Sequence, residues 1–128
     1  MKEIIQTGNA PKPVGPYSQA VKAGGFLFVS GQLGTDPKQG KIVAQDITEQ
    51  TRQALENVKA ILQAAGYTMA DVVKTEVFLS SMSSFKDFNS EYGKNFSTDA
   101  PARVTVAAEL PANALVEISA VAYRPFNV

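Results

Sequence analysis

An arginine opens a segment near the end of the chain that is otherwise valine, threonine and alanine. The segment begins Pro101-Ala102-Arg103 and has the composition of a β-strand. A single arginine in such a place usually sits at the rim of a sheet, in contact with water. The functional alternative is a guanidinium fork presented to a carboxylate, because its donors match the two carboxylate oxygens. Arg103 is therefore a candidate anchor for an acidic small molecule.

A glutamate lies inside the last strand-like segment, Leu115-Val116-Glu117-Ile118-Ser119-Ala120-Val121. The two-residue period of a strand places Glu117 and Ser119 on one face and the apolar residues between them on the other. That polar face could simply be solvated. If contacts between subunits cover it, Glu117 becomes a partly buried carboxylate and a candidate for proton transfer.

An aromatic residue follows a conformationally restricted pair in Gly15-Pro16-Tyr17-Ser18-Gln19. The surrounding segment, residues 8–18, contains three prolines and two glycines, so we expect either a rigid ordered loop or a flexible arm. Taken alone, the motif favours a stiff loop that caps the core. The alternative is that Tyr17 forms one wall of a binding site.

The composition excludes several kinds of chemistry. The chain has 128 residues, no cysteine and no histidine. Disulfides, thiolate nucleophiles and the usual zinc, haem and iron–sulfur ligand sets are therefore excluded, and only oxygen-ligand sites for Mg or Ca remain. Any proton transfer must use Asp, Glu, Lys, Tyr or water. We expect a protein without a metal or organic cofactor.

The charge balance and the hydropathy pattern narrow the class of protein further. Lys plus Arg and Asp plus Glu both number 12, and no basic run is present, so a nucleic-acid partner is not expected. There is no apolar run at the N-terminus of signal-peptide length and none long enough to span a bilayer. We expect a cytoplasmic, soluble protein without a membrane partner.

The elements that must position these residues follow from hydrophobic periodicity. We expect one domain over residues 1–128, of the α+β class, with two helices packed on one face of a mixed sheet. Asp46 with Glu49 resembles a capping box, and Gly66 supplies the stop of the first helix. The expected helices are residues 46–65 and 85–96, and the expected strands are near residues 4–5, 20–23, 26–30, 72–79, 103–108 and 115–123, with a further turn at residues 36–40.

Two helices can cover only one face of such a sheet. Val72, Phe78 and other apolar residues are expected on the opposite face, where water would otherwise contact them. Burial against partner subunits is the economical solution, so we expect an oligomer.

The motifs together resemble a family. Gly15-Pro16-Tyr17-Ser18-Gln19, Ser30-Gly31-Gln32, Pro101-Ala102-Arg103 and Leu110-Pro111 followed by Val116-Glu117-Ile118 are similar, in this order, to the hallmarks of the Rid/YjgF reactive-intermediate deaminases. The resemblance covers essentially the whole chain. It implies a chorismate-mutase-like (YjgF-like) fold and a homotrimer with clefts between subunits. It also implies hydrolysis of 2-aminoacrylate, 2-aminocrotonate and their imine tautomers to 2-keto acids and ammonia.

The resemblance also implies a role for each matching residue. The carboxylate-binding arginine of the family falls on Arg103, and its water-handling glutamate falls on Glu117. Substrate-binding roles are implied for five further residues. Tyr17 matches the aromatic wall of the cleft, and Ser30 and Gly31 match the pocket-lining pair. Asn89 matches the polar residue on the second helix, and Thr105 is the residue two positions after the arginine.

The sequence departs from the family pattern in three places. Thr105 stands where many members carry cysteine, so a thiol cannot be essential here. Ser119 stands where a second acidic residue is common. The spacing from Arg103 to Pro111 is one residue shorter than usual, which would reverse side-chain facing in a strand unless a bulge is gained or lost.

Two other functions remain open from the sequence. A non-catalytic regulatory protein could use the same cleft to bind small metabolites. A ribonuclease is less well supported, because the usual histidine acid–base pair is missing and the net charge is zero.

Overall fold

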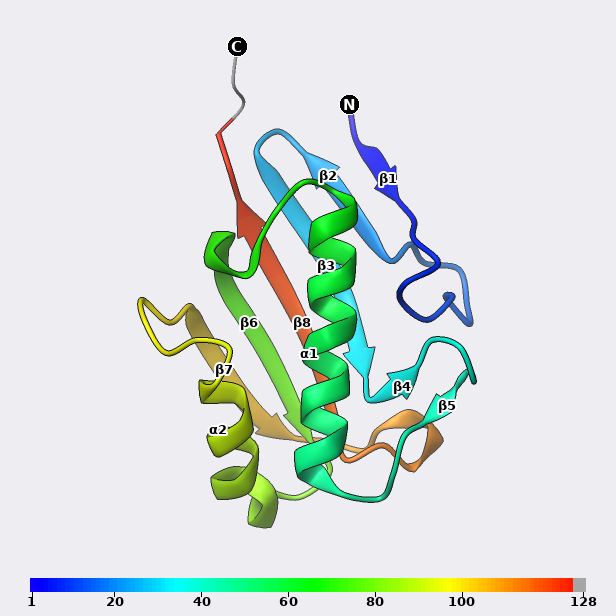
Figure 1. The fold of residues 1–128 in the computed structure, drawn as a ribbon, viewed down its shortest axis with the longest axis vertical. Coiled ribbons are helices and arrows are strands. Elements are labelled where there is room, and N and C mark those ends of the chain that lie inside the picture. The colour runs from blue at the N-terminus through cyan, green and yellow to red at the C-terminus, as the bar shows by residue number, and fades with distance from the viewer. Residues whose placement is uncertain (126–128) are drawn as a thin grey trace.

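The computed structural model describes residues 1–125, and its main feature is a six-stranded mixed sheet (Figure 1). Only β6 and β7 pair in parallel, while every other neighbouring pair is antiparallel. In spatial order the strands are β1 (Glu3–Ile5), β2 (Ala20–Ala23), β3 (Phe26–Leu33), β8 (Val116–Tyr123), β6 (Val72–Leu79) and β7 (Ala102–Ala107). A separate hairpin joins β4 (Thr35–Asp36) to β5 (Lys41–Ile42).

Two α-helices, α1 (Ile47–Ala64) and α2 (Phe85–Gly93), lie on the same face of this sheet (Figure 1). The predicted α+β architecture, with a mixed sheet and both helices on one face, is thereby confirmed. Short 3-10 turns precede β6 (Met69–Asp71), α2 (Met82–Ser84) and β8 (Pro111–Asn113). No helix within residues 1–125 is both long enough and apolar enough to cross a membrane.

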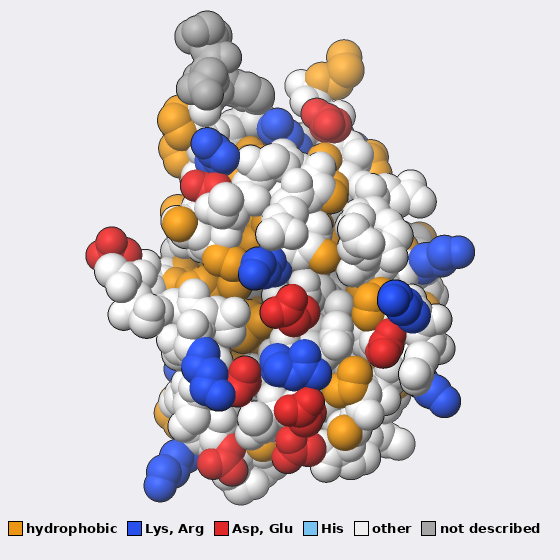
Figure 2. All heavy atoms as spheres, in the orientation of Figure 1, with side chains coloured by type: hydrophobic (Ala, Val, Ile, Leu, Met, Phe, Trp, Pro, Cys, Tyr) orange, Lys and Arg blue, Asp and Glu red, His pale blue; other side chains and the backbone are white. Residues whose placement is uncertain are grey.

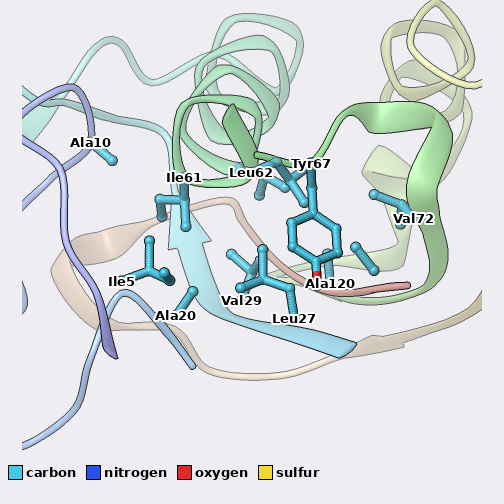
Figure 3. Packing of buried hydrophobic residues seen from close by; sticks show 12 residues of the cluster. Ile5, Ala10, Ala20, Leu27, Val29, Ile61, Leu62, Tyr67, Val72 and Ala120 are labelled. Carbon is cyan, nitrogen blue, oxygen red and sulfur yellow. The ribbon is translucent and has the colours of Figure 1, made fainter. Parts of the chain in front are cut away.

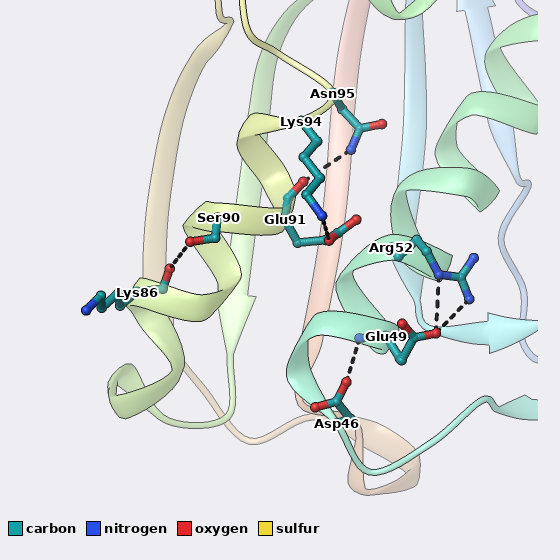
Figure 4. Close-up of polar contacts among 8 residues, drawn as sticks. All are labelled: Asp46, Glu49, Arg52, Lys86, Ser90, Glu91, Lys94 and Asn95. Atoms are coloured by element: carbon teal, nitrogen blue, oxygen red, sulfur yellow. Dashed lines mark hydrogen bonds and ion pairs between the residues drawn. The ribbon is translucent and has the colours of Figure 1, made fainter.

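The ends of the helices differ from the sequence predictions in detail. Asp46 caps α1 by accepting a hydrogen bond of 3.0 Å from the backbone N–H of Glu49, but the Glu49 carboxylate pairs with Arg52 at 3.0 Å (Figure 4). Only half of the predicted capping box is therefore present. The α2 helix ends at Gly93 and not at Phe96, because the backbone then forms three-residue turns, in which Phe96 N–H donates to the Gly93 carbonyl.

The core lies between the sheet and α1 (Figure 3). Leu27 and Val29 of β3 meet Ile61 and Leu62 of α1, and all four are buried. Val72 was expected on the opposite face, and this prediction is wrong: its side chain is 5% exposed and belongs to this core. The β6–β8 register shifts between Val72 and Lys74, so the strict alternation of a strand does not hold there.

The opposite face of the sheet is not covered by a helix, and it carries exposed apolar side chains at several positions. The strand registers place Phe28 beside Val121 and Phe26 beside Tyr123, with the Phe26 and Tyr123 ring centroids 4.9 Å apart. The large hydrophobic side chains left exposed on this face are Phe26, Phe28, Val104, Val106 and Tyr123, and we call these five residues the apolar face. Glu76 and Ser119, joined by a hydrogen bond of 3.4 Å, lie between Val104 and the three aromatic residues. Exposed apolar side chains on an uncovered sheet face are typical of surfaces that contact another protein.

Candidate active site

Arg103 lies on the helix-bearing side of the sheet, beneath α2. Its strand partner in β6 is Thr75, which is buried under the helices. The guanidinium carbon of Arg103 is 4.9 Å from the ring centroid of Tyr92, 5.5 Å from that of Phe88 and 5.7 Å from that of Phe85. All three rings come from α2. The edge strand β7 thus supplies the cation, and aromatic rings of α2 surround it.

Arg103 has no acidic partner within the part of the chain that the structure describes. None of the ion pairs within residues 1–125 includes it. Thr105 lies two residues further along the same face of β7. Its buried hydroxyl and the buried side-chain oxygen of Asn89 on α2 both lack a hydrogen-bond partner among residues 1–125. Buried polar atoms are normally satisfied, so these three residues, which we call the arginine half, are suited to a polar ligand.

The loop that carries Tyr17 is ordered by a glutamine that the sequence analysis did not single out. The Gln19 side chain is 2% exposed and forms hydrogen bonds of 2.7 and 3.0 Å to the backbone N–H and carbonyl of Thr7. It also donates to the carbonyls of Ala10 and Pro11. A short hydrogen bond from Tyr17 N–H to the Gly15 carbonyl tightens the turn itself. The loop is therefore rigid, with the Tyr17 side chain about half exposed.

Ser30 connects this loop to the sheet. Its hydroxyl donates to the Ser18 carbonyl at 2.6 Å, and its backbone N–H donates to the Gln19 carbonyl at 2.9 Å. The register of β3 against β8 shifts between Val29 and Gln32, so Ser30 and Gly31 lie in a β-bulge. The bulge breaks the alternation of β3 next to the predicted site.

Gly31 provides the space that Glu117 occupies. A side-chain carbon built on Gly31 would collide with the Glu117 carboxylate. Burial raises the pKa of the Glu117 carboxyl above its usual value of 4.5. Glu117 and Ser119 do share a face opposite Val116 and Ile118, as strand alternation predicts. We call Tyr17, Ser30, Gly31 and Glu117 the glutamate half.

The two halves do not meet within one chain. Glu117 pairs with Phe78 and lies on the side of the sheet that bears the apolar face, whereas Arg103 pairs with Thr75 on the helix side. The Tyr17 loop adjoins β2 and β3, while β7 forms the far edge of the sheet (Figure 1). Within one chain the two groups of residues therefore lie at separate places.

The shorter spacing between Arg103 and Pro111 does not disturb this arrangement. The parallel register of β7 on β6 is regular from Ala102 to Ala107, and Ala108 N–H still donates to the Leu79 carbonyl. The strand therefore contains no bulge between Ala102 and Ala107, and the facing of Arg103 and Thr105 is that of an uninterrupted strand.

A separate hollow of about 440 Å³ lies between α1 and the β4–β5 hairpin. None of the predicted site residues lines it, and its charged side chains are of mixed sign: Asp36, Lys38, Arg52 and Glu56. Within residues 1–125 there is no group of three or more acidic side chains placed to hold a metal ion. The two halves described above remain the better candidates for chemistry.

Comparisons with known proteins agree with the fold and the motifs. The family model described as Endoribonuclease L-PSP matches residues 7–124. A RutC family protein of Pyrococcus horikoshii is 56% identical over 125 residues, which cover 97% of this chain and 99% of that protein. Reactive Intermediate Deaminase A of Arabidopsis thaliana, a chloroplastic protein, is 44% identical over 122 residues, which cover 94% of this chain and 65% of that protein.

Solved structures of other proteins also resemble this fold. YyfA of Yersinia pestis, a protein of unknown function in the Rid family, superposes with a TM-score of 0.94 at 43% identity, covering 97% of this chain and 100% of that one. The chain therefore belongs to the L-PSP family of proteins, the Rid/YjgF family that its motifs resemble. The YjgF-like fold expected from the sequence is confirmed.

Replacing Gly31 by alanine should abolish most of the activity of the site with little loss of stability. The added methyl group collides with a flexible side chain, so Glu117 moves aside and the fold survives, with the free energy of unfolding changed by less than about 1 kcal/mol. Imine hydrolysis and denaturant unfolding would be measured on the same preparation. Gly93→Ala is the matched control, because nothing lies within 4 Å of a side-chain carbon at Gly93. Full activity in Gly31→Ala would exclude Glu117 in its observed position from the mechanism.

Proposed function

We propose that the protein is a hydrolytic deaminase of reactive enamines and imines, chiefly 2-aminoacrylate, 2-aminocrotonate and their imine tautomers. Membership of the Rid family supports a deaminase or L-PSP-type role in general. The observation that favours this substrate class is Arg103, a guanidinium with no ion-pair partner within residues 1–125, next to polar atoms that also lack partners. A small carboxylate that carries a polar nitrogen would satisfy these groups.

The proposed mechanism uses three residues. Arg103 binds the substrate carboxylate through two hydrogen bonds, and Tyr17 packs on the small alkyl group. Glu117 orients a water molecule and takes a proton from it as the oxygen adds to the protonated imine carbon. The resulting carbinolamine collapses by successive proton transfers. Glu117 gives its proton to the nitrogen, the C–N bond breaks and ammonia leaves, and the Glu117 carboxylate takes the hydroxyl proton as the carbonyl forms and then passes it to the departing ammonia. The products are a 2-keto acid and ammonia.

We also propose a homotrimer in which each site combines the arginine half of one chain with the glutamate half of its neighbour. Arg103 and Glu117 lie on opposite sides of one sheet, so a second copy must supply the missing half. The apolar face provides a surface for that contact. Within the same proposal the enzyme needs no cofactor and works in the cytoplasm.

Two alternatives to catalysis have different experimental signatures. A regulatory protein would bind 2-keto acids in the same cleft without turnover. A ribonuclease, the activity named in the family description, would need a surface that attracts phosphates. Figure 2 shows basic and acidic side chains interspersed over the face that carries α1, without a basic stripe. The deaminase explains Arg103 better than either alternative does.

The direct test generates 2-iminobutanoate in situ and follows its decay with and without the protein. Faster decay, with stoichiometric release of 2-oxobutanoate and ammonia, is expected. Decay at the uncatalysed rate, together with saturable binding of 2-oxobutanoate, would favour the regulatory alternative. Cleavage of RNA by the protein under the same conditions would favour the ribonuclease alternative.

The pH dependence should report on Glu117. Burial raises the pKa of the Glu117 carboxyl above 4.5, and the proposed base acts only when deprotonated. Activity should therefore fall on acidification at a higher pH than an ordinary glutamate would give, and the small residual activity of Glu117→Gln should lack that acidic decline. A raised pKa means that the folded state holds this proton more tightly than the unfolded chain, so this group favours folding at low pH. The loss of activity would thus precede unfolding, which circular dichroism of the same samples would check.

A further inference from the structure

The three rings above Arg103 form a cradle for its cation. Phe85, Phe88 and Tyr92, which we call the aromatic cradle, follow one another at three- and four-residue spacing along α2 and so lie on the same helix face. All three have centroids within 6 Å of the guanidinium carbon, the range in which a ring attracts a cation. One helix face therefore supplies the whole cradle.

The chemistry of the cradle differs from that of an ion pair. A carboxylate beside Arg103 would occupy its N–H donors and compete with an acidic substrate. Aromatic rings attract the cation through their faces and accept few hydrogen bonds, so the guanidinium donors that do not face the Tyr92 hydroxyl stay available. The absence of an ion pair to Arg103 among residues 1–125 is what such an arrangement requires.

Tyr92 is the ring held most firmly. Its hydroxyl and that of Thr75 are joined by a buried hydrogen bond of 2.7 Å. Its ring packs against Phe88 at 5.3 Å and against Phe96 at 4.7 Å between centroids. Thr75 is also the direct strand partner of Arg103, so the residue that anchors the ring sits beside the residue that carries the cation.

We propose that the aromatic cradle positions the Arg103 guanidinium for carboxylate binding, with Tyr92 and Phe85 as positioning residues. This inference rests on the proposed function of Arg103 as the substrate anchor. Its consequence is specific: loss of a ring should weaken the binding of acidic substrates while leaving the chemical step nearly unchanged.

Phe85→Leu is the most informative variant, because Phe85 is 37% exposed and its loss should perturb the fold little. Tyr92→Leu removes the nearest ring. Phe96→Leu is the control, since Phe96 packs on Tyr92 but its ring is not among those over Arg103. Phe85→Tyr keeps a ring in place and should behave as the native protein.

The measurements are KM and kcat for 2-iminobutanoate, and the Kd of pyruvate from a ligand-observed NMR titration. In Phe85→Leu and Tyr92→Leu we expect KM and Kd to rise about 2- to 30-fold, the range of one cation–π contact, with kcat nearly constant. Phe96→Leu should leave KM and Kd unchanged even if it melts earlier.

Unchanged KM and Kd in folded Phe85→Leu and Tyr92→Leu would overturn the cradle, as would an equal rise in Phe96→Leu. The pyruvate titration separates this result from a failure of the proposed function. A native protein that binds pyruvate in a cradle-dependent way without hydrolysing imines would support the cradle and refute the deaminase.

Discussion

Arg103→Lys should lower kcat/KM for 2-iminobutanoate by about 30- to 1,000-fold, which corresponds to roughly 2–4 kcal/mol of lost transition-state stabilisation. Lysine keeps the positive charge but loses the planar fork, so it attracts a carboxylate without fixing its orientation. Arg103 has no ion pair to lose within residues 1–125, and the free energy of unfolding should change by only about 0.5–1 kcal/mol. Steady-state kinetics and a melting curve of one preparation measure both effects.

Arg52→Lys is the matched control for this variant. Arg52 also holds a defined contact, an exposed pair with Glu49 on α1 (Figure 4), but it lies far from either half of the site along the chain. Its kinetics should be those of the native protein. A well-folded Arg103→Lys variant with an unchanged rate would remove Arg103 from the mechanism and, with it, the strongest residue-level support for a deaminase.

The order of the elements could be predicted from the sequence because local signals specify it. Gly24-Gly25 does form the hairpin between β2 and β3, with Gly24 at a φ of 61°. Asp46 caps the start of α1, and Gly66, at a φ of 83°, follows its end. Each of these features depends on residues close together in the chain, which is why a pattern of spacing was sufficient to find it.

Features that depend on distant pairing could not be predicted in the same way. The insertion of β6 between β8 and β7, and the parallel pairing of β6 with β7, involve segments far apart in sequence. Val72 was misplaced because a register shift interrupts the alternation of β6. Gln19 was missed because its partners, among them Thr7 and Ala10, are backbone groups that leave no sequence signal.

In the candidate site, too, local motifs could be found from the sequence, whereas contacts between distant segments could not. Motifs identified Arg103, Glu117 and Gly31, but only the structure shows that a bulge in β3 places Gly31 against the Glu117 carboxylate. Periodicity predicted a second helix over residues 85–96, without a role for its aromatic side chains. That three rings of this helix, Phe85, Phe88 and Tyr92, surround a cation depends on how α2 lies over β7.

In the proposed trimer, each site takes Arg103 from one chain and Glu117 from another. Arg103→Met keeps an unbranched side chain against the aromatic rings but removes the charge, and Glu117→Gln removes the base. Each variant alone should be nearly inactive while keeping a mass of about three times 13.7 kDa in light scattering. Co-expression of the two variants with different tags, followed by two affinity steps, would isolate trimers that contain both.

The activity of these mixed trimers distinguishes a site shared between two chains from a site within one chain. Around a ring of three chains, any mixture of the two variants contains one interface at which an intact Arg103 faces an intact Glu117, so we expect about one third of the native kcat. Reversal of the tags should give the same value. If Arg103 and Glu117 of the same chain formed the site, every chain in the mixture would lack one of them. A mixed trimer as inactive as either parent would therefore exclude a site shared between chains.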